Sequence, residues 1–405
     1  MNPNEDSEAR NRPLTSRRKL IFRLLALLIG VAVGLVMAEF GLRLVEKYQL
    51  GDRRGGDVVS DPQLGVRIPP NSPGHDANGY RNAAGRQQAD IVAVGDSQTW
   101  GVNVQAVDAW PQQLEKILQR PVYNMSVGGY GPVQYWQLIP KAVSFSPKVI
   151  VVGLYFGNDL YDAYSLTYAN EKYAELRSNS SADLKNDTIH TKADAFWNEE
   201  KDFHNVYGRN SIAGLSFWLR EHSAIGRLLN RNGLWPGATD VDFEIDKAWA
   251  QAYPDHGVVC EDDKVRTVFT TAYRLTALDL DEPRVREGLQ ITKLSLTRMQ
   301  EQASAANIKL VVMLIPTKES VYAELMNSER KSTGNYARLV NMEEKARQEV
   351  LALCATDKLN CVDALPELRK AIERRQQIYP STTESHPNAA GYRVLALRAS
   401  EAIKN

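Results

Sequence analysis

The chain has 405 residues, 43% hydrophobic and 24% charged, which is the composition of a globular protein with one large domain or two smaller ones. Its 49 basic and 49 acidic side chains balance. This balance argues against a nucleic-acid-binding function, because phosphate binding needs a clustered surplus of basic residues. No internal repeat or low-complexity tract stands out in the sequence.

A basic cluster and a long apolar run open the chain. Three basic residues at 17–19 precede residues 20–42, a run that only Arg23 and Glu39 interrupt, near its ends. That length suits a helix that crosses a hydrocarbon core of about 30 Å, and the preceding charges favour a cytosolic N-terminus. We therefore expect a cytosolic tail at 1–19, a single transmembrane anchor at 20–42 and a translocated remainder. A cleaved signal peptide and a buried soluble helix are the alternatives.

A linker and a large α/β domain are predicted after the anchor. Residues 43–88 are rich in Gly, Arg, Pro and Asn and predict a linker and lead-in to a domain over 89–405. Apolar strands alternate there with amphipathic helices, which predicts a three-layer α/β/α fold with a mainly parallel sheet. The alternation stops at about 160–283, a polar stretch that we interpret as an insertion. Cys354 and Cys361 are the nearest cysteines and can pair outside the cytosol, and no ligand spacing indicates a metal site.

Three apolar strands end in small or polar residues. "IVAVGDSQTWG" (91–101) leaves its strand through Gly-Asp-Ser, "NMSVGGYG" (124–131) through a double glycine, and "FGND" (156–159) through Gly-Asn-Asp. A single exit of this kind is an ordinary turn. The carboxyl ends of parallel strands meet at one edge of the sheet, where ligand sites lie. Three such exits therefore predict a shared site.

The residue types at these exits suit acyl transfer from an ester. That reaction needs a nucleophile, a base, a group that orients the base, and donors for the oxyanion. Ser97 suits the nucleophile. Its own N–H, the N–H of Gly129 and the uncharged amide of Asn158 suit the oxyanion donors, with Gly128 as the alternative glycine.

The base is expected near the C-terminus. Among six histidines, His386 alone lies in a loop of small residues just before a predicted helix, in "TTESHPNAAGY". Glu384, two residues earlier, can orient the imidazole. Asp96 and Asp159 are possible members of the site, but we expect them to cap helices or brace loops. Lys318, which follows a strand in "LIPTKE", could reach the site, but we expect it to be an exposed loop lysine.

The blocks "GDSQTWG", "NMSVGGYG", "FGND" and "ESHPNAAGY", in this order, resemble the four blocks of the SGNH (GDSL-like) hydrolase superfamily. The resemblance covers about residues 75–160 and 284–400. With "NGYRN" and "LIPTKESVY" it is similar to the membrane-anchored branch that includes acetyl-transfer proteins of polysaccharide modification. It implies a flavodoxin-like fold, and it assigns the roles above to the same serine, histidine, glycine and asparagine.

One position departs from this pattern. Much of the family has an Asp three residues before the His, where this chain has Thr383. Other branches place the acid two residues before, which Glu384 matches with one extra methylene. Thr383 as a hydrogen-bonding substitute therefore stays open. The α/β-hydrolase fold is disfavoured, because its GxSxG motif needs a glycine where this chain has Thr99.

The sequence thus predicts a serine hydrolase anchored in the cytoplasmic membrane, with its catalytic domain periplasmic or extracellular. The favoured activity is that of an O-acyl (acetyl) esterase that acts on a carbohydrate-linked or similar ester without a metal or organic cofactor. The first alternative uses the same centre to transfer the acyl group to a polysaccharide hydroxyl. The second is a non-catalytic glycan-binding or assembly protein on the same fold.

Overall fold

The computed structural model describes residues 16–49, 58–82, 86–178, 184, 186–210, 218–220, 222–231, 238–328 and 334–404. They fall into two compact units. The smaller unit draws its residues from 1–50 and 218–236, and the larger unit from 51–217 and 237–405. The candidate site residues all lie in the larger unit.

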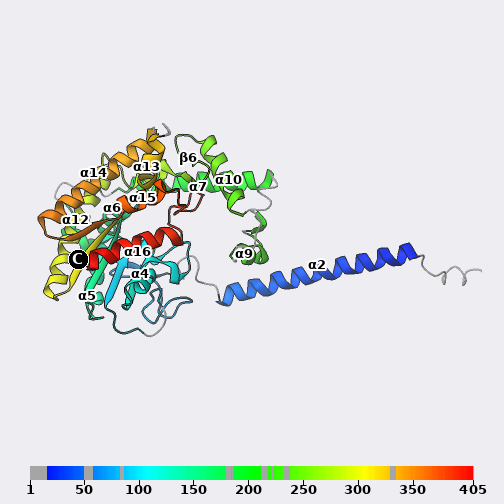
Figure 1. The fold of residues 1–405 in the computed structure, drawn as a ribbon, viewed down its shortest axis with the longest axis horizontal. Coiled ribbons are helices and arrows are strands. Elements are labelled where there is room, and N and C mark those ends of the chain that lie inside the picture. Colours follow the sequence, from blue (N-terminus) through cyan, green and yellow to red (C-terminus); the bar gives the residue numbers. More distant parts are fainter. Residues whose placement is uncertain are drawn as a thin grey trace, which may run out of the picture. The chain divides into compact units, whose positions relative to one another are not determined.

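The larger unit is built on a five-stranded sheet in which every neighbouring pair is parallel (Figure 1). Strands β3, β4 and β5 are buried along their whole length, as expected for apolar runs that helices cover on both faces. The order across the sheet is β4 (Val122–Ser126), β3 (Ile91–Gly95), β5 (Val149–Tyr155), β8 (Lys309–Ile315) and β9 (Asn360–Asp363).

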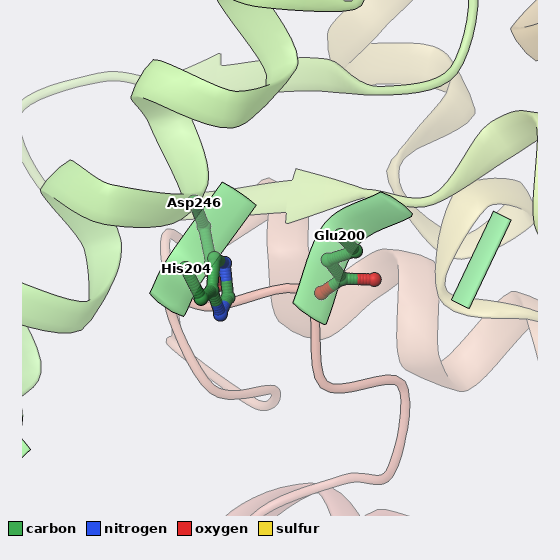
Figure 2. A group of neighbouring side chains, drawn as sticks. All are labelled: Glu200, His204 and Asp246. Atoms are coloured by element: carbon green, nitrogen blue, oxygen red, sulfur yellow. The ribbon is translucent and has the colours of Figure 1, made fainter. Parts of the chain in front are cut away.

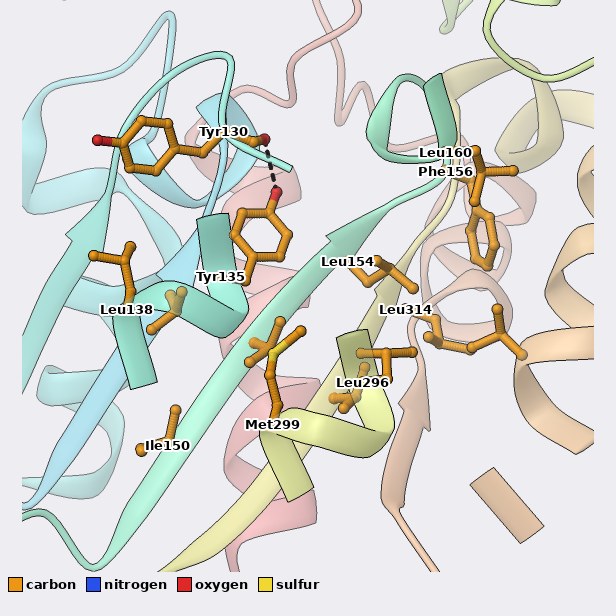
Figure 3. Packing of buried hydrophobic residues seen from close by; sticks show 14 of the residues in the cluster. Tyr130, Tyr135, Leu138, Ile150, Leu154, Phe156, Leu160, Leu296, Met299 and Leu314 are labelled. Carbon is orange, nitrogen blue, oxygen red and sulfur yellow. Dashed lines mark hydrogen bonds between the residues drawn. The ribbon is translucent and has the colours of Figure 1, made fainter. Parts of the chain in front are cut away.

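Two hydrophobic cores lie on the two faces of this sheet, because successive strand side chains point to opposite faces. In β5, Ile150 and Leu154 belong to one core and Val151 to the other. The first core (Figure 3) includes side chains of α5 (Pro132–Val143), α6 (Asp159–Ala169), α12 (Pro283–Ala305) and α14 (Gly334–Thr356). The second includes those of α4 (Trp110–Leu118), α13 (Lys318–Ser328), α15 (Leu365–Glu373) and α16 (Ala389–Lys404). The predicted three-layer α/β/α fold is confirmed.

The lead-in to the domain is packed onto the sheet. Residues 58–82 contain the short antiparallel pair β1 (Val59–Asp61) and β2 (Gly65–Arg67). The backbone N–H and C=O of Asn124 exchange hydrogen bonds of 2.8 Å with the side chain of Asn82. The "NGYRN" segment thus fixes the strand that leads to the double glycine.

The polar stretch of the sequence forms helices α7 (Thr188–Asn210) and α10 (Ala238–Ala252) and the hairpin β6 (Val258–Glu261) with β7 (Arg266–Phe269). Phe243, Trp249 and Val268 form a small core of its own. The hairpin also sends Cys260 and Phe269 into the second core of the sheet. The short helix η3 (Glu171–Leu176) precedes α7, and α11 (Thr271–Thr276) follows β7. They connect the stretch to the main domain.

A disulfide joins Cys354, in the last turn of α14, to Cys361 in β9, with their Cα atoms 6.0 Å apart. This is the pair that lies nearest in the sequence. The bridge fixes the end of α14 to the edge of the sheet.

The smaller unit contains helix α2 (Ser16–Gln49) and helix α9 (Ala224–Arg231). Residues Ser16–Leu44 of α2 are long and apolar enough to cross a membrane, with a mean hydropathy of 2.6 over an 18-residue window, and the described residues hold no second helix of this kind. Glu39 accepts hydrogen bonds from the N–H groups of Ala224 at 2.8 Å and Ile225 at 3.1 Å. A residue of the apolar helix therefore caps the start of α9.

Candidate active site

Ser97 stands at a tight strand-to-helix turn. Strand β3 ends at Gly95, and the short helix α3 (Ser97–Trp100) begins two residues later. Asp96 caps this helix, because its Oδ1 accepts from the N–H of Gln98 at 2.9 Å. A Cβ on Gly95 would lie 2.1 Å from Oγ1 of Thr99, so only glycine permits the turn. The turn presents the half-buried Ser97 at the carboxyl edge of the sheet.

A continuous hydrogen-bonded chain links Ser97, His386 and Glu384. The Nε2 atom of His386 lies 2.8 Å from Oγ of Ser97, and its Nδ1 lies 2.5 Å from Oε1 of Glu384. The same Glu384 oxygen accepts from the backbone N–H of His386 at 3.0 Å. The carboxylate thus fixes both the ring and the backbone of the histidine. The structure therefore brings together the three residues that the sequence singled out as nucleophile, base and orienting acid.

The electrostatics of the site follow from burial and hydrogen bonding. Burial raises the pKa of Glu384, but the hydrogen bonds and charge of His386 outweigh it and bring this pKa down to about 2. The fully buried Asp96 behaves in the opposite way. Burial raises its pKa to about 6, although the nearby charge of His386 opposes the shift. Glu384 therefore stays ionised beside the imidazole well below neutral pH, whereas Asp96 takes up a proton near pH 6.

The predicted oxyanion donors flank Ser97, the predicted nucleophile. Strand β3 lies between β4 and β5, so Ser97 lies between the exits that carry Gly128–Gly129 and Asn158. A Cβ on Gly128 would be 3.8 Å from Cβ of Ser97, and Gly129 has a φ of +81°, which favours glycine. Within the described ranges, the backbone N–H groups of Ser97 and Gly129 donate to no protein acceptor. Both remain able to bind an oxyanion.

The amide of Asn158 is held in one orientation. Its Nδ2 donates to the carboxylate of Asp162, one turn along α6, so one N–H is fixed and the second remains for a substrate. Asp159 braces the same loop. Its carboxylate accepts from the N–H of Tyr155 at 2.8 Å and from the hydroxyl of Tyr135 at 2.9 Å. The structural roles expected for Asp96 and Asp159 are both present.

Thr383, the other candidate for the residue that orients His386, contacts Asp246 instead. Its N–H donates to Oδ2 of Asp246, on α10, at 2.6 Å. Glu384 rather than Thr383 therefore contacts the imidazole of His386.

Two buried cations, whose roles the sequence analysis did not predict, hydrogen-bond to the loop that carries His386, called the histidine loop below. The expectation of an exposed Lys318 is wrong, because the side chain is 1% exposed. Its Nζ donates to the backbone oxygens of Thr382 at 2.9 Å and Glu384 at 3.0 Å, and also to Val268 O and Thr267 Oγ1 at 2.8 and 3.0 Å. Burial lowers the pKa of Lys318 to about 8. Its position directly after β8, at the same sheet edge as the other exits, was the available signal.

The second cation is Arg274, on α11. One guanidinium nitrogen donates to the backbone oxygen of Gly157 at 2.9 Å and another to Oγ of Ser385 at 2.8 Å. Arg274 thus connects the loop of Asn158 to the loop of His386. Nothing in the sequence indicated it, because it lies in the stretch interpreted as an insertion.

A protein-family model matches the part of the chain that carries His386 and Glu384. Residues 269–405 match the family model described as "SGNH hydrolase-like domain, acetyltransferase AlgX". The match includes Arg274, Lys318, Glu384 and His386 and begins after the strand exits of Ser97, Gly129 and Asn158. No curated protein matches the chain significantly.

Solved structures of GDSL-like proteins also match the chain. One, described as a putative lipolytic protein of the G-D-S-L family from Desulfitobacterium hafniense, is 12% identical, with a TM-score of 0.37 over 77% of this chain and 98% of that one. A GDSL-like lipase from Bacteroides thetaiotaomicron is 11% identical, with a TM-score of 0.30 over 78% of this chain and 87% of that one. Residues 269–405 are thus similar to the AlgX-like form of the SGNH hydrolase-like domain, and they form the part of the sheet and helices that carries His386 and Glu384.

Proposed function

We propose that this chain is a serine-dependent acyl-transfer enzyme that takes an acetyl group from an ester. The observation that carries the proposal is the hydrogen-bonded chain from Oγ of Ser97 through the imidazole of His386 to the carboxylate of Glu384. Such a chain activates a serine, because the base accepts its proton while the acid stabilises the imidazolium that forms.

The reaction proceeds in two steps. Oγ of Ser97 attacks the acyl carbonyl carbon and gives its proton to Nε2 of His386. The negative oxygen that forms is held by the N–H groups of Ser97 and Gly129 and by the amide of Asn158. The ester C–O bond then breaks, the leaving alcohol takes the proton from His386, and the acyl group stays on Ser97. An acceptor hydroxyl next gives its proton to His386 and attacks the acyl carbon. The bond from this carbon to Oγ of Ser97 then breaks, and His386 returns the proton to Oγ.

The acceptor decides between the two activities. Water as acceptor gives an O-acetyl esterase, and a sugar hydroxyl gives an O-acetyltransferase. The family model over residues 269–405 is named for an acetyltransferase, which favours transfer. The resemblance to the polysaccharide-modifying branch favours a carbohydrate as the group that carries the ester. We place the domain outside the cytoplasmic membrane, because basic residues 17–19 precede the apolar helix.

Hydrolysis of p-nitrophenyl acetate by the full-length chain in detergent tests the serine centre. We expect turnover in the wild type, a loss of at least about 10³-fold in Ser97→Ala, and no change in Ser144→Ala, an exposed serine of the same domain. Covalent labelling of Ser97 by a fluorophosphonate would reveal an activated serine even where water is a poor acceptor. A wild type that neither turns over nor labels would support the non-catalytic glycan-binding alternative.

Acceptor choice needs a second measurement. Adding a soluble oligosaccharide to the acetyl-enzyme should yield acetylated sugar, detected by mass spectrometry, if the enzyme is a transferase. Free acetate as the only product, with a rate that does not depend on the oligosaccharide, would assign the esterase activity instead.

A further inference from the structure

Three side chains outside the candidate active site converge between helices α7 and α10 (Figure 2). Glu200 and His204 are four residues apart on α7 and therefore share one face of that helix. Asp246 reaches the same point from α10. One potential ligand atom from each residue lies within 4.8 Å of the other two.

The donor set is that of a transition-metal site. It offers one imidazole nitrogen and two carboxylate oxygens, which are ligands that Zn²⁺ accepts at about 2.0–2.2 Å. Mg²⁺ and Ca²⁺ prefer oxygen ligands alone, so the histidine favours zinc. Nε2 of His204 and Oδ1 of Asp246 are in direct contact at 2.8 Å, so a small widening of this pair would place both atoms on one ion. Glu200 has three rotatable side-chain bonds with which to complete the set.

The charge balance of the cluster also favours a cation. Asp246 is 3% exposed and Glu200 is partly buried. Carboxylates that are withdrawn from water are costly unless positive charge or hydrogen bonds compensate them. Lys318 contributes some attraction, but its Nζ donates to Thr267 and to three backbone oxygens. A divalent ion bound by both carboxylates would balance their two negative charges.

The groups around the cluster orient these ligands. The N–H of Thr383 binds Oδ2 of Asp246, which leaves Oδ1 directed at His204. The side chain of Thr383 also hydrogen-bonds to Glu200. Partners of this kind fix metal-binding carboxylates in their coordinating positions. Because Thr383 directly precedes Glu384, the cluster is attached to the loop that carries the orienting acid and His386.

We propose that Glu200, His204 and Asp246 bind one divalent transition-metal ion, with zinc as the best chemical match. A water molecule would complete the coordination. The ion would fasten α7 and α10 to the histidine loop and would take no part in the acyl-transfer chemistry itself. The proposal does not depend on the proposed function of Ser97.

Zinc binding by the full-length chain in detergent tests the site. After removal of metals with EDTA, Zn²⁺ is titrated calorimetrically into the wild type, His204→Ala and His190→Ala. His190 is the matched control, since it lies on the same helix with Asp194 four residues away and at 3.3 Å, but both side chains are exposed. We expect one Zn²⁺ per wild-type chain, at least 100-fold weaker binding in His204→Ala, and unchanged binding in His190→Ala and Ser97→Ala.

X-ray absorption at the zinc edge keeps the test independent of variant folding. The wild type should show one imidazole and two to three oxygen ligands at about 2.0–2.1 Å. A wild type that binds no Zn²⁺, or equal binding in wild type and folded His204→Ala, would overturn the proposal. The His204–Asp246 contact would then be a buried ion pair that anchors the loop. Sulfur ligands at the zinc would overturn the proposal as well.

Discussion

At the scale of single residues, the carboxylate that orients His386 is a glutamate two positions before it. The extra methylene of Glu384 does not prevent contact, because the backbone turn between the two residues lets one oxygen reach both the ring and the N–H of His386. These bonds hold the pKa of Glu384 near 2 against the opposing effect of burial. A negative charge therefore lies beside the imidazole at neutral pH.

Replacing Glu384 by Gln should remove this charge while preserving the size of the side chain. We expect kcat for p-nitrophenyl acetate to fall by about 10²–10⁴-fold with little change in KM, since the carboxylate acts on the imidazolium formed in the transition state. Thr383→Val, which removes the hydroxyl at the neighbouring position, is the comparison. A larger loss in Thr383→Val than in Glu384→Gln would show that threonine has the orienting role.

Lys318 is a positioning residue, because it binds the backbone oxygens of Thr382 and Glu384 and not the reacting atoms. Lys318→Met should lower kcat by about 10–100-fold through loss of these buried bonds. The wild type should also lose activity as the pH rises through about 8, where this ammonium loses its proton.

Lys309→Met serves as the control for that variant. Lys309 also donates to a backbone oxygen, that of Ala402 at 2.9 Å, but it lies at the start of β8, away from the histidine loop. Equal losses in the two variants, or a wild-type profile that stays flat to pH 9.5, would contradict the positioning role.

At the scale of elements, the sequence was enough to predict the sheet and the strand exits. The runs over β3, β4 and β5 are apolar and end in small polar residues, and adjacent parallel strands necessarily bring these ends together. The role of Arg274 was not predictable, because burial of a single cation depends on long-range packing that no local pattern encodes, whereas Lys318 had one signal, its position after β8. The cluster that contains Glu200 and Asp246 was also not predictable from local patterns, because 46 positions separate these residues in the sequence.

Arg274 should couple two elements of the site, the loop after β5 and the histidine loop. Arg274→Met removes both of its hydrogen bonds and leaves the oxygen of Gly157 without that partner, so we expect kcat to fall by about 100-fold. Ser385→Ala removes only one of the bonds and should cost about 3–10-fold. Steady-state kinetics on both variants and on the double variant measure the coupling.

The double variant should be no worse than Arg274→Met, because both changes break the same connection. Fully additive losses would contradict this coupling. Arg398→Met is a suitable control, since Arg398 donates to the backbone oxygen of Asp363 at 3.1 Å, outside the loops of the site.

At the scale of the whole molecule, buried carboxyl groups should make stability depend on pH. Burial raises the pKa of Asp96 to about 6 and those of Asp162 and Glu343 to about 7. Between pH 5 and 7 the folded chain therefore binds protons that the unfolded chain has released, and stability falls as the pH rises. The wild type should unfold a few degrees higher at pH 5 than at pH 7.5, as measured by calorimetry. Asp162→Asn should reduce this difference, and an unchanged slope in that variant would count against the assignment.

At the same scale, helix α2 is predicted to anchor the chain in a membrane. Helix α2 is apolar over Ser16–Leu44, and its Glu39 caps α9, a segment far along the chain, as expected for a helix that the mature protein retains. An N-terminal tag should therefore stay on the mature chain in carbonate-washed membranes. Protease added to spheroplasts should digest the SGNH domain but leave the tag. Leu28→Arg with Val31→Arg, each costing about 2.5–3.5 kcal/mol at the bilayer centre, should release the chain from the membrane. A shortened chain without its tag would instead identify a cleaved signal peptide, and a protected domain would reverse the orientation.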